Sequence, residues 1–159
     1  DLIPKKDSMR VGIAVDGSPQ SKAVVRYILN NLDFFGKDSK FYLIHVTSDI
    51  SLTLLAGVST GAPQPLKGTD LEAIKEETYR EATEDIVPML DKAGIEYEKV
   101  CVEGTPGDVL AKVAKKKKLS LMVMGTHGYG RFKSAVMGSV ATRIAASSNV
   151  PLLVIRTAS

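Results

Sequence analysis

The run Leu119-Ser120-Leu121-Met122-Val123-Met124 leads directly into Gly125 and a glycine-rich loop. A strand-length run that is almost wholly apolar is typical of a central strand in a parallel sheet, where helices bury both faces. The loop ends at Gly138, and residues 139–147 repeat apolar side chains at helical spacing. Residues 119–147 therefore predict a buried strand, a connecting loop and a helix, which is the repeating unit of an α/β fold.

The same alternation continues toward both ends of the chain. Four further strand-length segments are found at residues 11–15, 41–46, 95–102 and 151–155. Helical segments separate them, starting near residues 19, 69 and 105, with the first expected to stop at Gly36 and the second near Lys92. We predict a single-domain α/β fold, a three-layer α/β/α sandwich with a five-stranded parallel sheet. Segment 95–102 alternates with charges, which predicts a more exposed strand.

Local signals predict where the helices begin and where they break. Ser18-Pro19 and Thr105-Pro106 each combine an N-cap residue with proline at the first helical position. Thr69-Asp70-Leu71-Glu72 has capping-box spacing, and Pro88 should kink or interrupt the helix that follows. Residues 47–68 contain repeated glycine and proline and are predicted to form a long loop, of the functional or mobile kind.

Composition restricts the class of protein. The chain has 159 residues, 44% hydrophobic and 25% charged, which fits one globular domain. One cysteine and two histidines exclude an internal disulfide framework and a His/Cys zinc site, and they fit a reducing cytoplasm. Apolar runs are far shorter than the roughly 18 residues of a membrane span, so we expect a cytoplasmic protein. Residues 1–8 are interpreted as a tag or flexible extension, with the domain at 9–159.

Much of the net charge of +3 comes from Lys112 and the run Lys115-Lys116-Lys117-Lys118. Runs of one sign can bind nucleic acid or anionic lipid. The end of a helix also favours cations, because the helix dipole is negative there. Aromatic residues do not interleave with these lysines, which argues against binding of single-stranded nucleic acid. We interpret the run as a solvated helix end and expect no nucleic-acid partner.

Two features lie where doubly wound folds bind ligands, beyond the carboxyl ends of strands at the point where the strand order reverses. Asp16 directly follows the first strand, and the glycine-rich loop 125–138 follows the fourth. Glycines let the backbone approach a ligand, and the free N–H groups of a helix starting at Gly138-Ser139 suit phosphate. The alternative is that the glycines only shape a connection and Ser139 only caps a helix. The loop is neither a P-loop nor a dinucleotide fingerprint.

Individual side chains near these features each leave two interpretations open. Asp16 is a candidate ligand for a ribose or a metal, or a cap of the first helix. His127 is a candidate phosphate contact or an exposed loop histidine. Arg131 and Lys133 either neutralise phosphate charge or lie on the surface. His45, on an apolar strand, is expected to be a histidine whose hydrogen bonding is satisfied at the end of the sheet.

The spacing Gly125-x2-Gly128-x9-Gly138-Ser139 matches the nucleotide motif of the universal stress protein family. Four other segments resemble the family in the same order, at residues 11–18, 43–46, 105–108 and 150–155. The resemblance spans roughly residues 9–157. Because all motif positions are present, the chain resembles the ATP-binding subgroup with the intact G-2x-G-9x-G-S motif.

The resemblance implies a Rossmann-like fold of the adenine nucleotide alpha-hydrolase-like kind, with strand order 3-2-1-4-5. It also implies a bound adenine nucleotide, ATP or another, together with Mg²⁺ whose protein ligands remain unassigned. By position, the adenine pocket would be lined by Ala14, Val15, Val46 and Met124. Asp16 would face the ribose or the region of the phosphates and metal.

The phosphates would lie on the glycine motif. The residues carried over for this role are Gly125, Gly128, Gly138, Ser139 and Val140, and the loop adds His127 and Arg131 as candidates. Ala141 departs from the pattern, because some members supply a further hydroxyl there. We expect this departure to weaken phosphate binding without abolishing it.

The resemblance implies a nucleotide-dependent stress-response or regulatory module that acts as a homodimer. A slow ATPase or autophosphorylating enzyme is one alternative, and a nucleotide-free structural dimer is another. We assign no catalytic residue and expect no efficient catalysis, because no clear general base is paired with a nucleophile. Residues 151–155 form an apolar strand at the predicted sheet edge, and pairing with a second copy would cover it.

Overall fold

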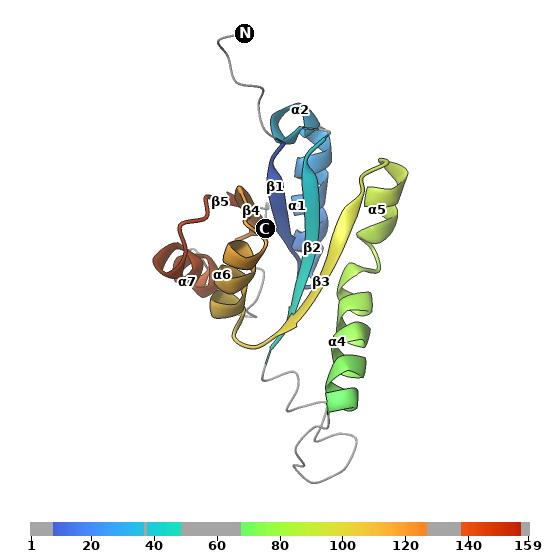
Figure 1. Ribbon diagram of the computed structural model, residues 1–159. Helices are drawn as coiled ribbons and strands as arrows, with labels where there is room; N and C mark the ends of the chain where they lie inside the picture. Colours follow the sequence, from blue (N-terminus) through green and yellow to red (C-terminus); the bar gives the residue numbers. More distant parts are fainter. Residues whose placement is uncertain (1–7, 37, 49–67, 127–137, 157–159) are drawn as a thin grey trace.

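The computed structural model describes residues 8–36, 38–48, 68–126 and 138–156. Along the chain, its elements are β1 (Arg10–Ala14), α1 (Pro19–Asn30), α2 (Leu32–Phe35), β2 (Lys40–Thr47), α4 (Gly68–Thr83), α5 (Val87–Lys92), β3 (Tyr97–Glu103), α6 (Pro106–Lys116), β4 (Leu121–Gly125), α7 (Ser139–Ser147) and β5 (Leu152–Ile155). The strands form one parallel sheet in the order β3-β2-β1-β4-β5 (Figure 1). This confirms the α/β fold and the strand order expected from the sequence.

Helices cover both faces of the sheet and divide the core into two clusters. On one face, α1, α4 and α5 pack against the sheet through side chains such as Val24, Tyr79 and Leu90. On the other face, α6 and α7 contribute side chains such as Leu110 and Ile144. None of the helices within the described ranges is long and apolar enough to cross a membrane.

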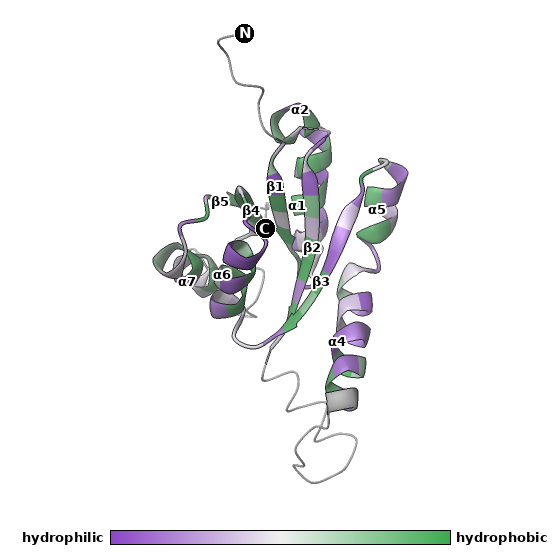
Figure 2. Ribbon diagram, viewed as in Figure 1, coloured by the Kyte–Doolittle hydropathy of each residue, from purple (hydrophilic) through white to green (hydrophobic). Residues whose placement is uncertain are grey.

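The strands differ in burial according to their place in the sheet. Every residue of β4, and every residue but the first of β1 and β2, is buried. Most residues of β3 are only half-buried, and Figure 2 shows its mixed hydropathy. The edge position of β3 therefore confirms the exposure predicted from its alternating charges.

Two segments are each divided into two helices: the first was predicted to be continuous to Gly36, and the second was predicted to be interrupted at Pro88. Asn31 separates α1 from α2, with φ −129° and ψ 34°, and its Nδ2 donates to the Tyr27 carbonyl at 2.8 Å. The second break falls between α4 and α5, and Pro88 lies in the first turn of α5. Proline is tolerated there because the backbone N–H of a first-turn residue has no carbonyl partner within the helix, so its loss costs no hydrogen bond. The predicted interruption is thus confirmed, and the break itself precedes the proline.

The predicted caps are only partly correct. Ser18 and Thr105 are N-cap residues followed by proline, but neither side chain makes a capping hydrogen bond. Helix α4 begins at Gly68, so Thr69 lies within the helix and not at its N-cap. Of the predicted loop 47–68, Thr47 is the last residue of β2, and residues 49–67 lie outside the described part of the chain.

The lysine run lies at the end of a helix, as predicted. Helix α6 ends at Lys116, and Lys117 follows as its C-cap. Lys117 forms an ion pair with Glu98 at 2.7 Å, and its Nζ lies 5.9 Å from the ring centroid of Tyr42. Arg10 and Lys40 also lie over this ring, at 5.3 Å and 5.2 Å. Three cations thus cover the buried Tyr42 ring, an arrangement that stabilises the ring through cation–π attraction.

Replacing Tyr42 with phenylalanine should leave the free energy of unfolding unchanged or raise it by up to about 1 kcal/mol. The Tyr42 hydroxyl is buried and has no hydrogen-bond partner among the described residues, so its desolvation is uncompensated. Urea unfolding of the Tyr42→Phe variant tests this. A clear loss of stability would show that the hydroxyl makes a favourable bond, whereas Tyr42→Ala should cost about 3–5 kcal/mol through lost packing.

Candidate functional site

The strand order reverses between β1 and β4, which are parallel neighbours paired through Val11–Leu121 and Ile13–Val123. Because the two strands run in the same direction, their carboxyl ends lie at the same edge of the sheet. Asp16 follows β1 there, and Gly125 ends β4. The structure therefore brings together the two features that the sequence predicted as a ligand site.

Gly138 joins the start of α7 to this edge. A Cβ atom at Gly138 would lie 3.0 Å from the carbonyl oxygen of Thr126, the residue that follows β4. The Thr126 N–H in turn donates to the Ile155 carbonyl at 3.1 Å, which fixes this segment against β5. Glycine permits this close backbone approach. Gly138 is the N-cap of α7, and the first N–H groups of a helix have no partner within it. The edge therefore presents donors suited to an anion.

An apolar floor lies beneath this edge on the side of α6 and α7. Ala14, Val46 and Met124 are at most 4% exposed and belong to one cluster, against which the half-buried Val140 packs. Val15 instead belongs to the cluster on the opposite face. The structure thus groups three of the four residues carried over for the adenine pocket and separates Val15 from them. Ser139 is exposed at the start of α7.

Asp16 is held by two serines, Ser18 in the turn between β1 and α1 and Ser21 in the first turn of α1. Its Oδ1 accepts hydrogen bonds from the Ser18 N–H at 3.0 Å, the Ser18 hydroxyl at 2.6 Å and the Ser21 hydroxyl at 2.9 Å. The Asp16 N–H donates to the Ser21 hydroxyl oxygen at 3.1 Å. Ser18 therefore bonds Asp16 in place of capping α1. Sequence reasoning did not single out Ser21, although the spacing Asp16-x-Ser18-x2-Ser21 carries the signal.

His45 links the second strand to the same turn. Its Nδ1 lies 2.9 Å from the carbonyl oxygen of Val15, which can only accept, so Nδ1 carries the proton. Burial lowers the pKa of His45 below its usual 6.5, although the Val15 hydrogen bond and the charge of Asp16 oppose this effect. His45 is therefore neutral at pH 7. This confirms the interpretation of His45 as a histidine satisfied at the end of the sheet.

Other predicted residues lie outside the described part of the chain. These are His127, Gly128 and Arg131, together with Lys133. Within the described ranges, no group of three or more His, Cys, Asp or Glu side chains could hold a metal ion. Asp16 lies two residues beyond the end of β1, and a metal bound there would need most of its ligands from elsewhere.

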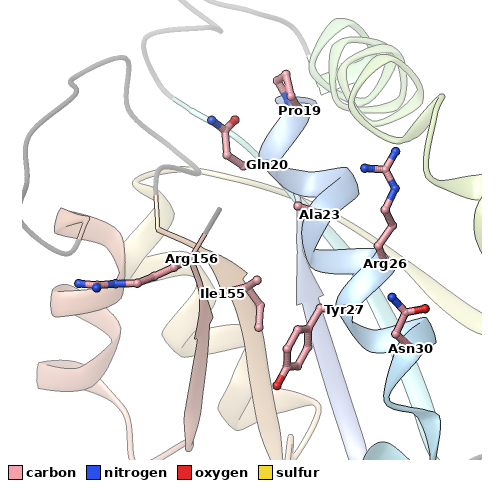
Figure 3. A pocket seen from close by; sticks show the side chains of 8 residues that line it. All are labelled: Pro19, Gln20, Ala23, Arg26, Tyr27, Asn30, Ile155 and Arg156. Carbon is pink, nitrogen blue, oxygen red and sulfur yellow. The ribbon is translucent and has the colours of Figure 1, made fainter. Parts of the chain in front are cut away.

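A surface hollow of about 480 Å³ lies beside this edge, between α1 and the end of β5. In Figure 3, the Tyr27 side chain reaches from α1 toward Ile155, whereas Arg156 extends away from α1. Tyr27 is 42% exposed. Among the described residues, its lining includes none that was predicted to bind nucleotide. The hollow marks a different feature, the incompletely covered flank of the edge strand β5.

Comparison with known proteins places this architecture among characterised ones. A model of the universal stress protein family matches residues 8–156. The chain is 29% identical over 147 residues to the universal stress protein MJ0531 of Methanocaldococcus jannaschii. This alignment covers 92% of this chain and 81% of MJ0531.

Two solved structures share the fold. The structure of MJ0577 of Methanocaldococcus jannaschii has a TM-score of 0.73 at 20% identity and covers 96% of this chain and 98% of that one. The structure of At3g01520, a universal stress protein family protein of Arabidopsis thaliana with AMP bound, has a TM-score of 0.64 at 17% identity. It covers 95% of this chain and 93% of that one.

The lowered pKa of His45 predicts a pH dependence of stability. In the unfolded chain His45 takes up a proton near pH 6.5, whereas in the folded protein it takes one up only at lower pH. The free energy of unfolding should therefore be highest above pH 6.5 and fall as the pH drops below it. Urea unfolding between about pH 7 and pH 5 measures how the free energy of unfolding changes with pH. His45→Asn should make this dependence weaker, whereas the control His127→Asn should keep it. A slope that disappears with His127 instead would contradict the assignment.

Proposed function

The chain belongs to the universal stress protein family, and we propose that it binds an adenine nucleotide at the edge of the sheet where the carboxyl ends of β1 and β4 lie. The observation that carries the proposal is the close approach of Gly138 to the Thr126 carbonyl. This contact brings the start of α7 to the end of β4, and Asp16 follows β1 at the same edge of the sheet. This edge then combines three features that a nucleotide requires. The N–H donors suit the phosphates, the carboxylate suits the ribose, and the apolar floor suits the base.

The ligand we propose is ATP or another adenine nucleotide with Mg²⁺. The AMP bound to the Arabidopsis relative supports the adenylate class. In this chain, the adenine would lie over the floor formed by Ala14, Val46 and Met124, and Asp16 would accept a hydrogen bond from the ribose. Since the described residues offer no acidic cluster, Mg²⁺ would be held mainly by phosphate oxygens and water, as is common for this ion.

The phosphates would be held by Gly125, Gly138, Ser139 and Val140. Gly128 completes the proposed phosphate site on the basis of the family motif, and His127 and Arg131 are further candidates because they lie in the same loop. Such a site is built largely from backbone N–H groups and fixes its ligand without a catalytic base. We therefore propose a cytoplasmic regulatory module, formed by a domain at residues 9–159, whose nucleotide state conveys the stress response.

We also propose that the module acts as a homodimer paired through β5. This strand lies at the edge of the sheet and is bonded to β4 on one side. Its residues Leu152, Leu153 and Val154 are only half-buried although they are apolar. The hollow that contains Tyr27 lies on the same flank. Two-fold pairing of β5 with a second copy would satisfy its outer backbone groups and cover these side chains.

Nucleotide binding should depend on the absence of a side chain at position 138. Gly138→Val would push α7 away from the Thr126 carbonyl and should weaken ATP binding about tenfold or more. Isothermal calorimetry with ATP, ADP and AMP, with and without Mg²⁺, measures this. Gly94→Ala is a matched control, because Gly94 has φ +69° and lies away from this edge, so the variant should lose stability but keep its affinity. If the unmodified chain binds none of these nucleotides, the proposed function is wrong.

The dimer can be tested without disturbing the sheet. The Pro151 carbonyl accepts from the Met122 N–H of β4 at 2.9 Å, and the Ile155 carbonyl accepts from the Thr126 N–H just after β4 at 3.1 Å. The backbone groups of Leu152 and Val154 therefore point to the outer edge. Val154→Pro therefore removes an outer N–H while keeping the bonds to β4. Light scattering should give the mass of two chains for the unmodified protein and of one chain for Val154→Pro. A single-chain mass for the unmodified protein would contradict the proposal.

A further inference from the structure

The buried serine of α1 is the part of the nucleotide edge that neither the motif nor the family resemblance includes. Ser21 is 5% exposed, and its hydroxyl forms two bonds to the same residue. It donates to Asp16 Oδ1 at 2.9 Å and accepts from the Asp16 N–H at 3.1 Å. A helix residue thus holds both the backbone and the carboxylate of the residue that follows β1.

The hydrogen bonds to Asp16 are unevenly divided between its two carboxylate oxygens. Three donors converge on Oδ1, two from Ser18 and one from Ser21. An oxygen with three donors has little capacity for another. Among the described residues, the hydrogen bonds to this carboxylate all fall on Oδ1. The carboxylate is therefore fixed in one rotamer, with Oδ2 left as the acceptor for a ligand.

We infer that Ser21 is a positioning residue for nucleotide binding, acting through Asp16. This inference rests on the proposed function, because Asp16 must contact the nucleotide for its orientation to matter. A carboxylate that is fixed before the ligand arrives loses less side-chain entropy on binding. Ser21 is suited to this role because its own position is fixed by α1, where its N–H donates to the Ser18 carbonyl at 3.0 Å.

The competing interpretation is that Ser21 only stabilises the turn between β1 and α1. Both interpretations predict that Ser21→Ala lowers the thermal stability. They differ in what happens to affinity. A purely structural serine would weaken folding alone, whereas a positioning serine changes affinity only while the Asp16 carboxylate is present to be positioned.

The test is a double-mutant cycle on the full chain, with the dissociation constants for ATP and AMP measured by calorimetry. Ser21→Ala should weaken binding about fivefold, the equivalent of one lost hydrogen bond. Asp16→Ala should weaken it more, and Ser21→Ala should add no further loss in the Asp16→Ala background. Ser21→Thr, which keeps a hydroxyl, should restore most of the affinity.

Ser39→Ala is the matched control. Ser39 is 9% exposed, accepts from the Met9 N–H at 3.0 Å and donates to the Phe35 carbonyl, but it lies at the opposite edge of the sheet. Its removal should lower the melting temperature as Ser21→Ala does and leave the affinity unchanged.

Two results would overturn the inference while the proposed function stands. One is nucleotide binding that is unchanged in Ser21→Ala, and the other is an equal loss of affinity with and without Asp16. If the unmodified chain binds neither ATP nor AMP, the proposed function and the inference fail together. Each variant's melting curve shows whether it is folded. If Ser21→Ala is not, Ser21→Cys carries the test with the same expected loss of affinity, because a thiol is only a weak hydrogen-bond donor.

Discussion

The parallel pairing of β1 with β4 is the constraint on which the rest of the structure depends. It sets the point where the strand order reverses, and it places Asp16 and Gly125 at one edge. Both strands lie in the interior of the sheet, so their residues are almost all buried between two helix layers. Strands buried on both faces are nearly continuous apolar runs, which is why the most apolar segments occupy these positions.

The candidate site is built from the ends of elements. Helix α1 reaches the edge through the Asp16–Ser18–Ser21 hydrogen bonds, and α7 reaches it through the contact between Gly138 and Thr126. Such a site relies on backbone donors and one fixed carboxylate. The free N–H groups at the start of α7 suit binding of an anionic ligand.

Two differences between expectation and structure, at Ser18 and at Asn31, share one cause. Ser18 and Thr105 were correctly predicted as N-cap residues, yet their side chains make no capping bonds, and Ser18 bonds Asp16 instead. The helix expected to run to Gly36 breaks at Asn31, whose side chain bonds the Tyr27 carbonyl. Short polar side chains can form several local hydrogen bonds of similar energy. Sequence indicates that such a residue is near a helix end, but it does not select the partner.

By itself, the sequence determined the alternation of strands and helices, the exposed character of β3, and the placement of Asp16 and the glycine motif at strand ends. These properties depend on spacing along the chain, which a single sequence displays. Alternation along the strand also places Val15 on the face opposite Ala14. Only the tertiary structure decided that His45 donates to Val15 and that Ser21 holds Asp16. The physical reason is that each of these contacts depends on where a side chain points after the sheet and helices have packed. Periodicity sets the buried face of an element, whereas the partner of a polar group depends on distances between atoms that are separate in the sequence.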